Sequence, residues 1–249
     1  MKKLGSIVLL VGLVLVLVAS SAWAVPYDSN NNVLANTTGF SWVDSPYWTI
    51  TDGTTYEEGT TAFTLTKENA AYESDFGLFI VDDIANPNSA TIKKFEIFSA
   101  SDEPDDLDTF LDVIFKYTAG SGWEVARAHN QAEANAATWT PFGITFGFYY
   151  GVHVKTDDGA IDYNLVDYTY YSDPRLNTVD QGDQHVAVEW NGIDDVRIYL
   201  EDLRSANADW DWLDMKIYGD DLKPIPEPGT LALLGLGLFG LAVVRRRRK

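Results

Sequence analysis

The sequence predicts an all-β body, an antiparallel β-sandwich of jelly-roll type, over residues 25–223 of the 249-residue chain. Three observations point to this class. Short runs of aromatic and β-branched residues recur along the chain, turn residues separate them, and helical periodicity is nearly absent. A body of this length fits one ordinary domain.

The clearest predicted strand lies at 144–155. Its apolar residues alternate with small or polar ones over the whole stretch, which is the period of a strand with one face on a core. We expect Phe146 and Phe148 to share the buried face and Tyr149 to point the other way. The alternation therefore predicts a long, half-buried strand.

Further strands are expected on both sides of this one. They lie at 40–51, 60–66, 72–81, 91–99, 111–117, 123–128, 186–190, 196–200 and 212–218. Asp52-Gly53, residues 120–122 and Asn191-Gly192 are hairpin turn signals. The Ala-rich stretch 129–138 is the one predicted helix.

The N-terminal stretch 1–24 has the pattern of a secretory signal peptide. Lys2 and Lys3 precede an apolar run, and Ala22-Trp23-Ala24 provides a cleavage site of the small-x-small type. We expect signal peptidase to remove it. A retained N-terminal anchor is the minor alternative.

The C-terminal segment 224–249 has three ordered parts: a proline-rich hinge, an uncharged run over 231–244 and five terminal cations. The apolar run is short, because a typical membrane span takes about 20 residues. Lys and Arg nevertheless mark the cytoplasmic side of a membrane segment, and their long stems help a short helix to reach across. The tail therefore predicts a single transmembrane helix whose basic end is cytoplasmic.

This tail resembles the PEP-CTERM sorting signal of Gram-negative bacteria. The resemblance rests on Pro226, Glu227 and Pro228, on the apolar run, and on the basic end formed by Arg245, Arg246, Arg247 and Arg248. It implies anchoring in the inner membrane and cleavage near Pro-Glu-Pro by a membrane-embedded exosortase. The body would then reach the cell surface or the extracellular matrix, where such proteins usually accompany exopolysaccharide. A plain membrane anchor is the alternative; it has the same topology and is not cleaved.

Composition narrows the function of the body. Without Lys2, Lys3 and the five tail cations, 11 Lys plus Arg remain; without Glu227, 36 Asp plus Glu remain, so the net charge is near −25. Nucleic acid and anionic lipid would repel such a body. The chain has no cysteine, which excludes disulfides, cysteine nucleophiles and zinc-thiolate sites.

The best candidate site is acidic. Glu201 and Asp202 precede a short spacer, and Asp209, Asp211 and Asp214 follow it. Three carboxylates at this spacing, in a loop that enters a strand, suit a hard cation, and calcium accepts irregular oxygen sites. We expect one calcium ion as a cofactor here; a solvated acidic loop is the alternative. A second acidic run at 102–108 is predicted to be an exposed loop.

The body also resembles an exported bacterial domain family of unknown function over about residues 140–222. The end motif of that family reads E-D-L, a spacer, then D-x-D-x-N-D, and the same five acidic residues match it. Further matches are residues 146–149, 171–174 and 185–186. The chain departs at Leu213, where the family has Asn, so that amide cannot be a ligand here.

These features predict a non-catalytic structural or adhesive protein of the cell surface or matrix. The alternative is a carbohydrate-binding module for exopolysaccharide, with Trp210 and Trp212 as the best candidates for stacking on sugar rings. A hydrolase comes third, and no catalytic residue is assigned. The three histidines have no metal-ligand spacing and are expected to be structural.

Overall fold

The computed structural model describes residues 26, 33–51, 59–68, 73–100, 109–128, 131–153, 166–180, 182–202, 210, 212 and 214–226. Ala24–Ile225 forms one compact unit, the body, and the two terminal segments are assigned to another. The predicted signal peptide and the apolar tail run lie outside the described residues. No helix in the described part of the chain has the length and hydropathy that crossing a membrane requires.

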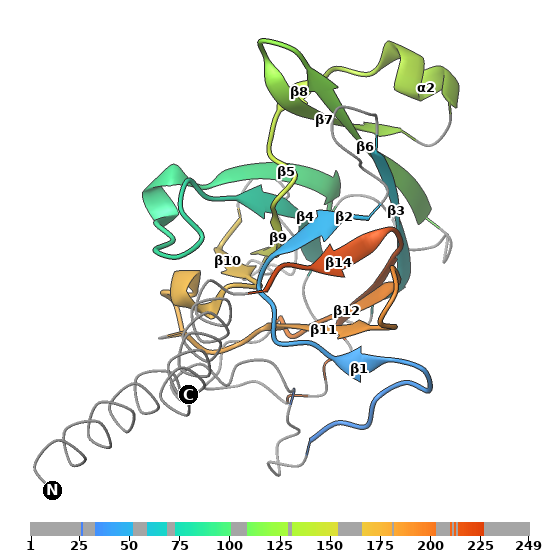
Figure 1. Cartoon of the computed structure of the whole chain (residues 1–249). Helices are drawn as coiled ribbons and strands as arrows, with labels where there is room; N and C mark the ends of the chain where they lie inside the picture. Colours follow the sequence, from blue (N-terminus) through green and yellow to red (C-terminus); the bar gives the residue numbers. More distant parts are fainter. Residues whose placement is uncertain are drawn as a thin grey trace, which may run out of the picture. The chain divides into compact units, whose positions relative to one another are not determined.

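The body is all-β with antiparallel sheets, as predicted (Figure 1). The eight-stranded sheet has the order β1 (Ser41–Trp42), β11 (Val186–Trp190), β12 (Val196–Leu200), β13 (Met215–Gly219), β3 (Gly59–Glu68), β6 (Thr109–Thr118), β7 (Gly122–Ala128), β8 (Thr140–Pro141). The four-stranded sheet has the order β10 (Tyr168–Tyr171), β9 (Gly147–His153), β4 (Glu73–Ile80), β5 (Lys93–Phe98). A third sheet pairs β14 (Leu222–Pro224) with β2 (Trp48–Ile50), and the short helices are η1 (Ser89–Thr91), α2 (Gln131–Ala136) and η2 (Pro174–Leu176).

The two larger sheets share one core made mainly of aromatic and branched side chains. Phe148 contacts rings from several elements: its centroid lies 5.9 Å from Trp48, 6.3 Å from Phe63, 6.0 Å from Phe76 and 6.2 Å from Phe146. Such ring pairs add to the free energy gained by burying apolar area. Because the chain has no disulfide, this core has to hold the body together.

Strand β9 has the predicted buried face toward the main core, but its other face is buried as well. Phe148 is fully buried in the main core, and Tyr149 belongs to a separate cluster on the opposite face. The prediction of a half-buried strand is wrong, because every residue of β9 is buried. Glycines allow aromatic rings to cover the outer face of β9 closely. A Cβ on Gly77 would lie 2.9 Å from the Tyr149 ring, and one on Gly147 would clash with the Phe79 ring. The two rings therefore lie directly against glycine backbone, which a larger residue would prevent.

The predicted strand 40–51 is two separate elements. β1 joins the edge of the eight-stranded sheet, whereas β2 pairs with β14. Pro46 lies between them, and proline has no N–H for a strand ladder. The predicted hairpin at Asp52-Gly53 is also wrong, because β2 and β3 pair with other strands; the turn residues themselves lie outside the described residues.

The other two predicted hairpins are present. β6 and β7 pair antiparallel, with Gly120 and Gly122 at positive φ in the turn. β11 and β12 pair across a longer loop than the two-residue turn that Asn191-Gly192 suggests. There the Asn191 Oδ1 atom accepts the backbone N–H groups of residues 193, 194 and 195, which closes the loop around its own side chain.

We expect Phe148→Ala to lower the free energy of unfolding by about 3–5 kcal/mol, as truncation of buried aromatic residues does. Chemical denaturation of the body measures this, with the exposed Lys93→Ala in β5 as the control. A loss no larger than that of Lys93→Ala would contradict the central position of Phe148 in the core.

We also expect the body to lose stability above about pH 10. Burial is the main reason that several tyrosines have pKa values above the ordinary 10.0: Tyr47, Tyr149, Tyr150, Tyr171, Tyr199 and Tyr218. Above pH 10 the unfolded chain releases phenolic protons that the folded chain retains, so the free energy of unfolding falls as pH rises. Phenolate absorbance should therefore appear together with unfolding. Phenolate formation near pH 10 with native circular dichroism would contradict this.

Candidate metal site at the end of the core

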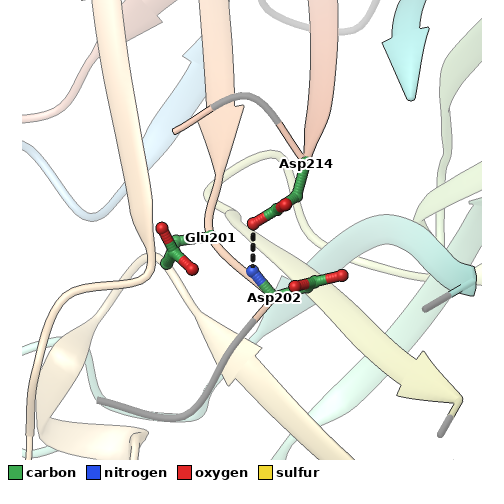
Figure 2. A group of neighbouring side chains, drawn as sticks. All are labelled: Glu201, Asp202 and Asp214. Carbon is green, nitrogen blue, oxygen red and sulfur yellow. Dashed lines mark hydrogen bonds between the residues drawn. The ribbon is translucent and has the colours of Figure 1, made fainter. Parts of the chain in front are cut away.

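Two neighbouring strands bring the predicted acidic residues together. β12 and β13 are antiparallel with Leu200 opposite Met215, so the residues after β12 lie beside the residue before β13. Glu201 and Asp202 follow β12, and Asp214 precedes β13. The Asp202 N–H donates a hydrogen bond of 2.8 Å to Asp214 Oδ2, which fixes one end of the group (Figure 2).

The three carboxylates are close and shielded from water. One oxygen from each lies within 4.8 Å of the others; Glu201 is 0% and Asp202 1% exposed, and Asp214 is half-buried. Two unit negative charges at this distance repel by about 3 kcal/mol at an effective dielectric constant of 20. Oxygens bound to one calcium ion lie at most about 5 Å apart, because each is 2.3–2.6 Å from the ion. The group therefore has the charge and the spacing to hold a calcium ion.

The charges of this group act on a buried tyrosine. Tyr150 is fully buried on the inner face of β9, and its hydroxyl has no hydrogen-bond partner among the described residues. Burial raises its pKa, and so do the neighbouring Tyr170 and the charges of Asp202, Glu201 and Asp214. Tyr150 is therefore neutral at pH 7. A buried tyrosine hydroxyl normally has a partner, and none of the described residues supplies one here.

A second layer holds the backbone of Glu201. Its N–H donates to the His185 carbonyl at 3.1 Å, and His185 Nδ1 lies 3.0 Å from the Glu201 carbonyl oxygen. The imidazole stacks on Tyr170 with 3.7 Å between centroids. Its Nε2 lies 3.1 Å from Asp180 Oδ2, which also accepts the Tyr170 hydroxyl. Burial lowers the pKa of His185, although the Glu201 carbonyl and Asp180 oppose this. These contacts fix the position of Glu201.

The loop that enters β13 has an unusual backbone. Trp210 and Trp212 both have positive φ, 56° and 57°, which bulky residues rarely adopt. This left-handed backbone is why the predicted strand 212–218 begins only at Met215. The indole of Trp210 lies 5.5 Å from the His185 ring, and Trp212 is 2% exposed. The expectation of an exposed Trp212 is therefore wrong, and Trp210 is half-buried.

The structure thus brings together three of the five predicted metal ligands, while Asp209 and Asp211 lie outside the described residues. That the group holds an ion stays a prediction. The sequence did not point to Tyr150. The available signal was that a tyrosine on the buried face of a strand normally has a hydrogen-bond partner for its hydroxyl. Asp180 gave no such signal, since only the fold places it beside His185.

The acidic run 102–108 lies outside the described residues. Of the predicted sorting residues, Pro226 is described and exposed. The rest lie outside the described residues: Glu227, Pro228, Arg245, Arg246, Arg247 and Arg248. His153 and His185 are buried, in keeping with a structural role.

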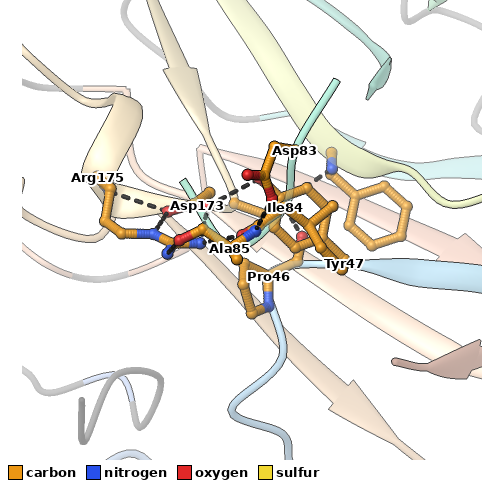
Figure 3. Close-up of polar contacts among 9 residues, drawn as sticks. Pro46, Tyr47, Asp83, Ile84, Ala85, Asp173 and Arg175 are labelled. Atoms are coloured by element: carbon orange, nitrogen blue, oxygen red, sulfur yellow. Dashed lines mark hydrogen bonds and ion pairs between the residues drawn. The ribbon is translucent and has the colours of Figure 1, made fainter. Parts of the chain in front are cut away.

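A second buried carboxylate has all its hydrogen bonds within the protein (Figure 3). Asp173 accepts from the Tyr47 hydroxyl at 2.8 Å and from Arg175 Nε at 2.8 Å and an Arg175 terminal nitrogen at 2.6 Å. Arg175 also donates to the carbonyls of Ile84 and Ala85. Opposite charges and these hydrogen bonds satisfy the carboxylate within the protein, so the group links the start of η2 to Tyr47, which precedes β2, and to the 84–85 turn.

The comparison with known proteins identifies the tail. The family described as PEP-CTERM protein-sorting motif matches residues 224–248, which confirms the resemblance found in the sequence. No protein of curated function matches the chain, and no solved structure matches it.

The chain therefore carries a PEP-CTERM sorting motif at its C-terminus. The motif implies export through the exosortase system and a tail anchored in the membrane before processing. The resemblance of the body to the exported domain family stays a prediction.

Proposed function

We propose that the body is a non-catalytic structural or adhesive domain that binds one calcium ion at the end of its core. The tail delivers it to the surface or extracellular matrix of a Gram-negative bacterium, alongside exopolysaccharide. The observation that carries the calcium proposal is the group of Glu201, Asp202 and Asp214, in which one oxygen from each carboxylate lies within 4.8 Å of the others and two of the three residues are fully buried. Asp209 and Asp211 would supply further oxygens by their place in the sequence.

Calcium would act on stability because it binds the folded body. Three carboxylates in one buried group repel each other, and a divalent ion turns that repulsion into attraction. Stabilisation at a hundredfold excess over Kd is about 2.7 kcal/mol. Extracellular calcium sites often have Kd values near 10⁻⁴–10⁻³ M, so millimolar calcium is the appropriate range.

The structure favours this class over sugar binding. A sugar-binding platform needs exposed aromatic faces, and Trp212 is buried against Ala187 and Tyr199. The aromatic side chains around the acidic group, such as Tyr170, pack against protein rather than forming an open surface.

Melting of the body in EDTA and in millimolar calcium tests the calcium proposal. We expect calcium to raise Tm well beyond magnesium, which prefers octahedral sites and keeps its waters. Asp214→Asn should melt no lower than wild type in EDTA, because it removes one repelling charge, and should lose most of the calcium increment. Tyr150→Phe should also reduce the increment without lowering Tm in EDTA.

The exposed Asp82→Asn is the matched control and should keep the full calcium increment. Equal effects of calcium and magnesium, or a full calcium increment in Asp214→Asn, would show that the acidic group does not hold a calcium ion.

The sorting proposal predicts loss of the tail. Intact-mass analysis of body released from cells that contain exosortase should give a mass that lacks residues 231–249, and cells without the enzyme should retain the full tail. Released body that still contains 231–244 would indicate a plain anchor.

A further inference from the structure

The edge of the four-stranded sheet at β10 is closed by a side chain. β10 is the outer strand of that sheet, and among the described strands only β9 pairs with it (Figure 1). Backbone groups of successive residues in an antiparallel ladder point alternately toward the partner strand and away from it. Ser172 donates its N–H to the Phe148 carbonyl, toward β9, so the N–H and C=O of Tyr171 point to the outer edge. By the same alternation, those of Thr169 point to the outer edge as well.

The side-chain amide of Asn177 occupies the outer groups of Tyr171. The Tyr171 N–H donates to Asn177 Oδ1 at 2.8 Å, and Asn177 Nδ2 donates to the Tyr171 carbonyl at 3.1 Å. One amide group thus forms both of the hydrogen bonds that a residue of a neighbouring strand would form with Tyr171. Asn177 is 1% exposed, so this closure is part of the packed body.

The loop that carries Asn177 fixes the position of the amide. The Asn177 N–H donates to the Pro174 carbonyl at 2.9 Å, and the Asn177 carbonyl accepts the Gly182 N–H at 2.9 Å. Its Nδ2 atom also donates to the Asp183 carbonyl at 2.9 Å. The helix η2, which precedes Asn177, is in turn fixed by the buried carboxylate of Asp173 (Figure 3). The amide is therefore held against the edge from both ends of its loop.

The other edges of the two larger sheets are protected in different ways. β1 and β8 are two residues long, and β8 ends in Pro141, which has no N–H. β5 begins with two lysines, and Arg127 donates to the carbonyls of Glu96 at 3.3 Å and Ile97 at 2.8 Å. β10 has the sequence Tyr-Thr-Tyr-Tyr, which is uncharged and favours strands. Neither length, proline nor charge protects β10, so the Asn177 amide takes that role.

We propose that the Asn177 amide is an autoinhibitory contact that prevents β10 from pairing with β10 of a second copy of the body. Without it, two copies would pair antiparallel about a two-fold axis at Tyr170, with Thr169 of each copy opposite Tyr171 of the other. This pairing would satisfy the outer N–H and C=O groups of both residues and would join two four-stranded sheets into one. An uncharged, unprotected edge is a template for such strand addition. The contact keeps each exported body a separate unit.

The charge of the body sets the conditions of the test. At a net charge near −25, two bodies repel each other at low salt. The screening length falls to about 8 Å at about 0.15 M salt, so association is measured at this salt concentration and above. The body, Ala24–Ile225, is one compact unit and is the protein to use.

Truncation of Asn177 tests the inference. Sedimentation velocity over a wide range of protein concentrations compares wild type with Asn177→Ala and with Asn177→Ser, whose hydroxyl cannot form both hydrogen bonds. We expect wild type to be monomeric and both variants to form a dimer whose share grows with concentration. The matched control is Asn191→Ala, because Asn191 also closes a loop around its side chain but lies between two paired strands, away from a sheet edge. This control should stay monomeric.

A second substitution locates the edge that pairs. Thr169→Pro removes the outward N–H of Thr169 and leaves the ladder with β9 in place, because proline is tolerated where the N–H of an edge strand points away from its partner. We expect Asn177→Ala combined with Thr169→Pro to return to the monomer. Association that Thr169→Pro does not reverse would show that the copies meet elsewhere, and it overturns the inference.

Amide hydrogen exchange on the wild-type body tests the contact without any substitution. We expect the Tyr171 amide to exchange more slowly than the Thr169 amide, because Asn177 accepts the first and no described residue accepts the second. Equal exchange of the two amides overturns the inference. So does an Asn177→Ala or Asn177→Ser body that has native circular dichroism and remains monomeric at every concentration.

Discussion

The structure depends on the contact between the two larger sheets around Phe148. Rings from β2, β3, β4 and the approach to β9 surround this side chain. With no cysteine in the chain, burial of these apolar faces has to offset the conformational entropy of the body. Both sides of β9 contribute, since glycines in β4 and β9 let a second aromatic cluster lie against the outer face.

The acidic group lies where this core ends. Burying a charge away from water is costly unless the charge is paired, so three carboxylates of one sign at this point are unfavourable for the body alone. His185 and its partners fix the backbone of Glu201. Asp173 differs from the acidic group, because this buried carboxylate forms an ion pair with Arg175. One buried carboxylate has its partners within the fold, and the acidic group is the one for which we propose an ion.

The sequence revealed the fold class because alternation and turn residues are local signals. Phe146 and Phe148 were assigned to the buried face correctly, as were the hairpins whose two strands adjoin in sequence. Pairings between distant segments left no such signal, so β14 was missed and 40–51 was read as one strand. For the same reason, the sequence pointed to Glu201, Asp202 and Asp214, which are close together in the chain, and gave no pointer to Tyr150, which belongs to the other large sheet.

The pairing of β14 with β2 also has a consequence for the order of folding. β1 pairs with β11, β3 with β13 and β2 with β14, so strands near the start of the body can pair only after the strands near its end are present. Such high contact order slows folding, because long loops must close before the contacts form. A chain that crosses a membrane N-terminus first cannot complete this body until residue 225 has emerged. For a chain exported in that direction, this pairing would make folding of the body one of the last steps of export.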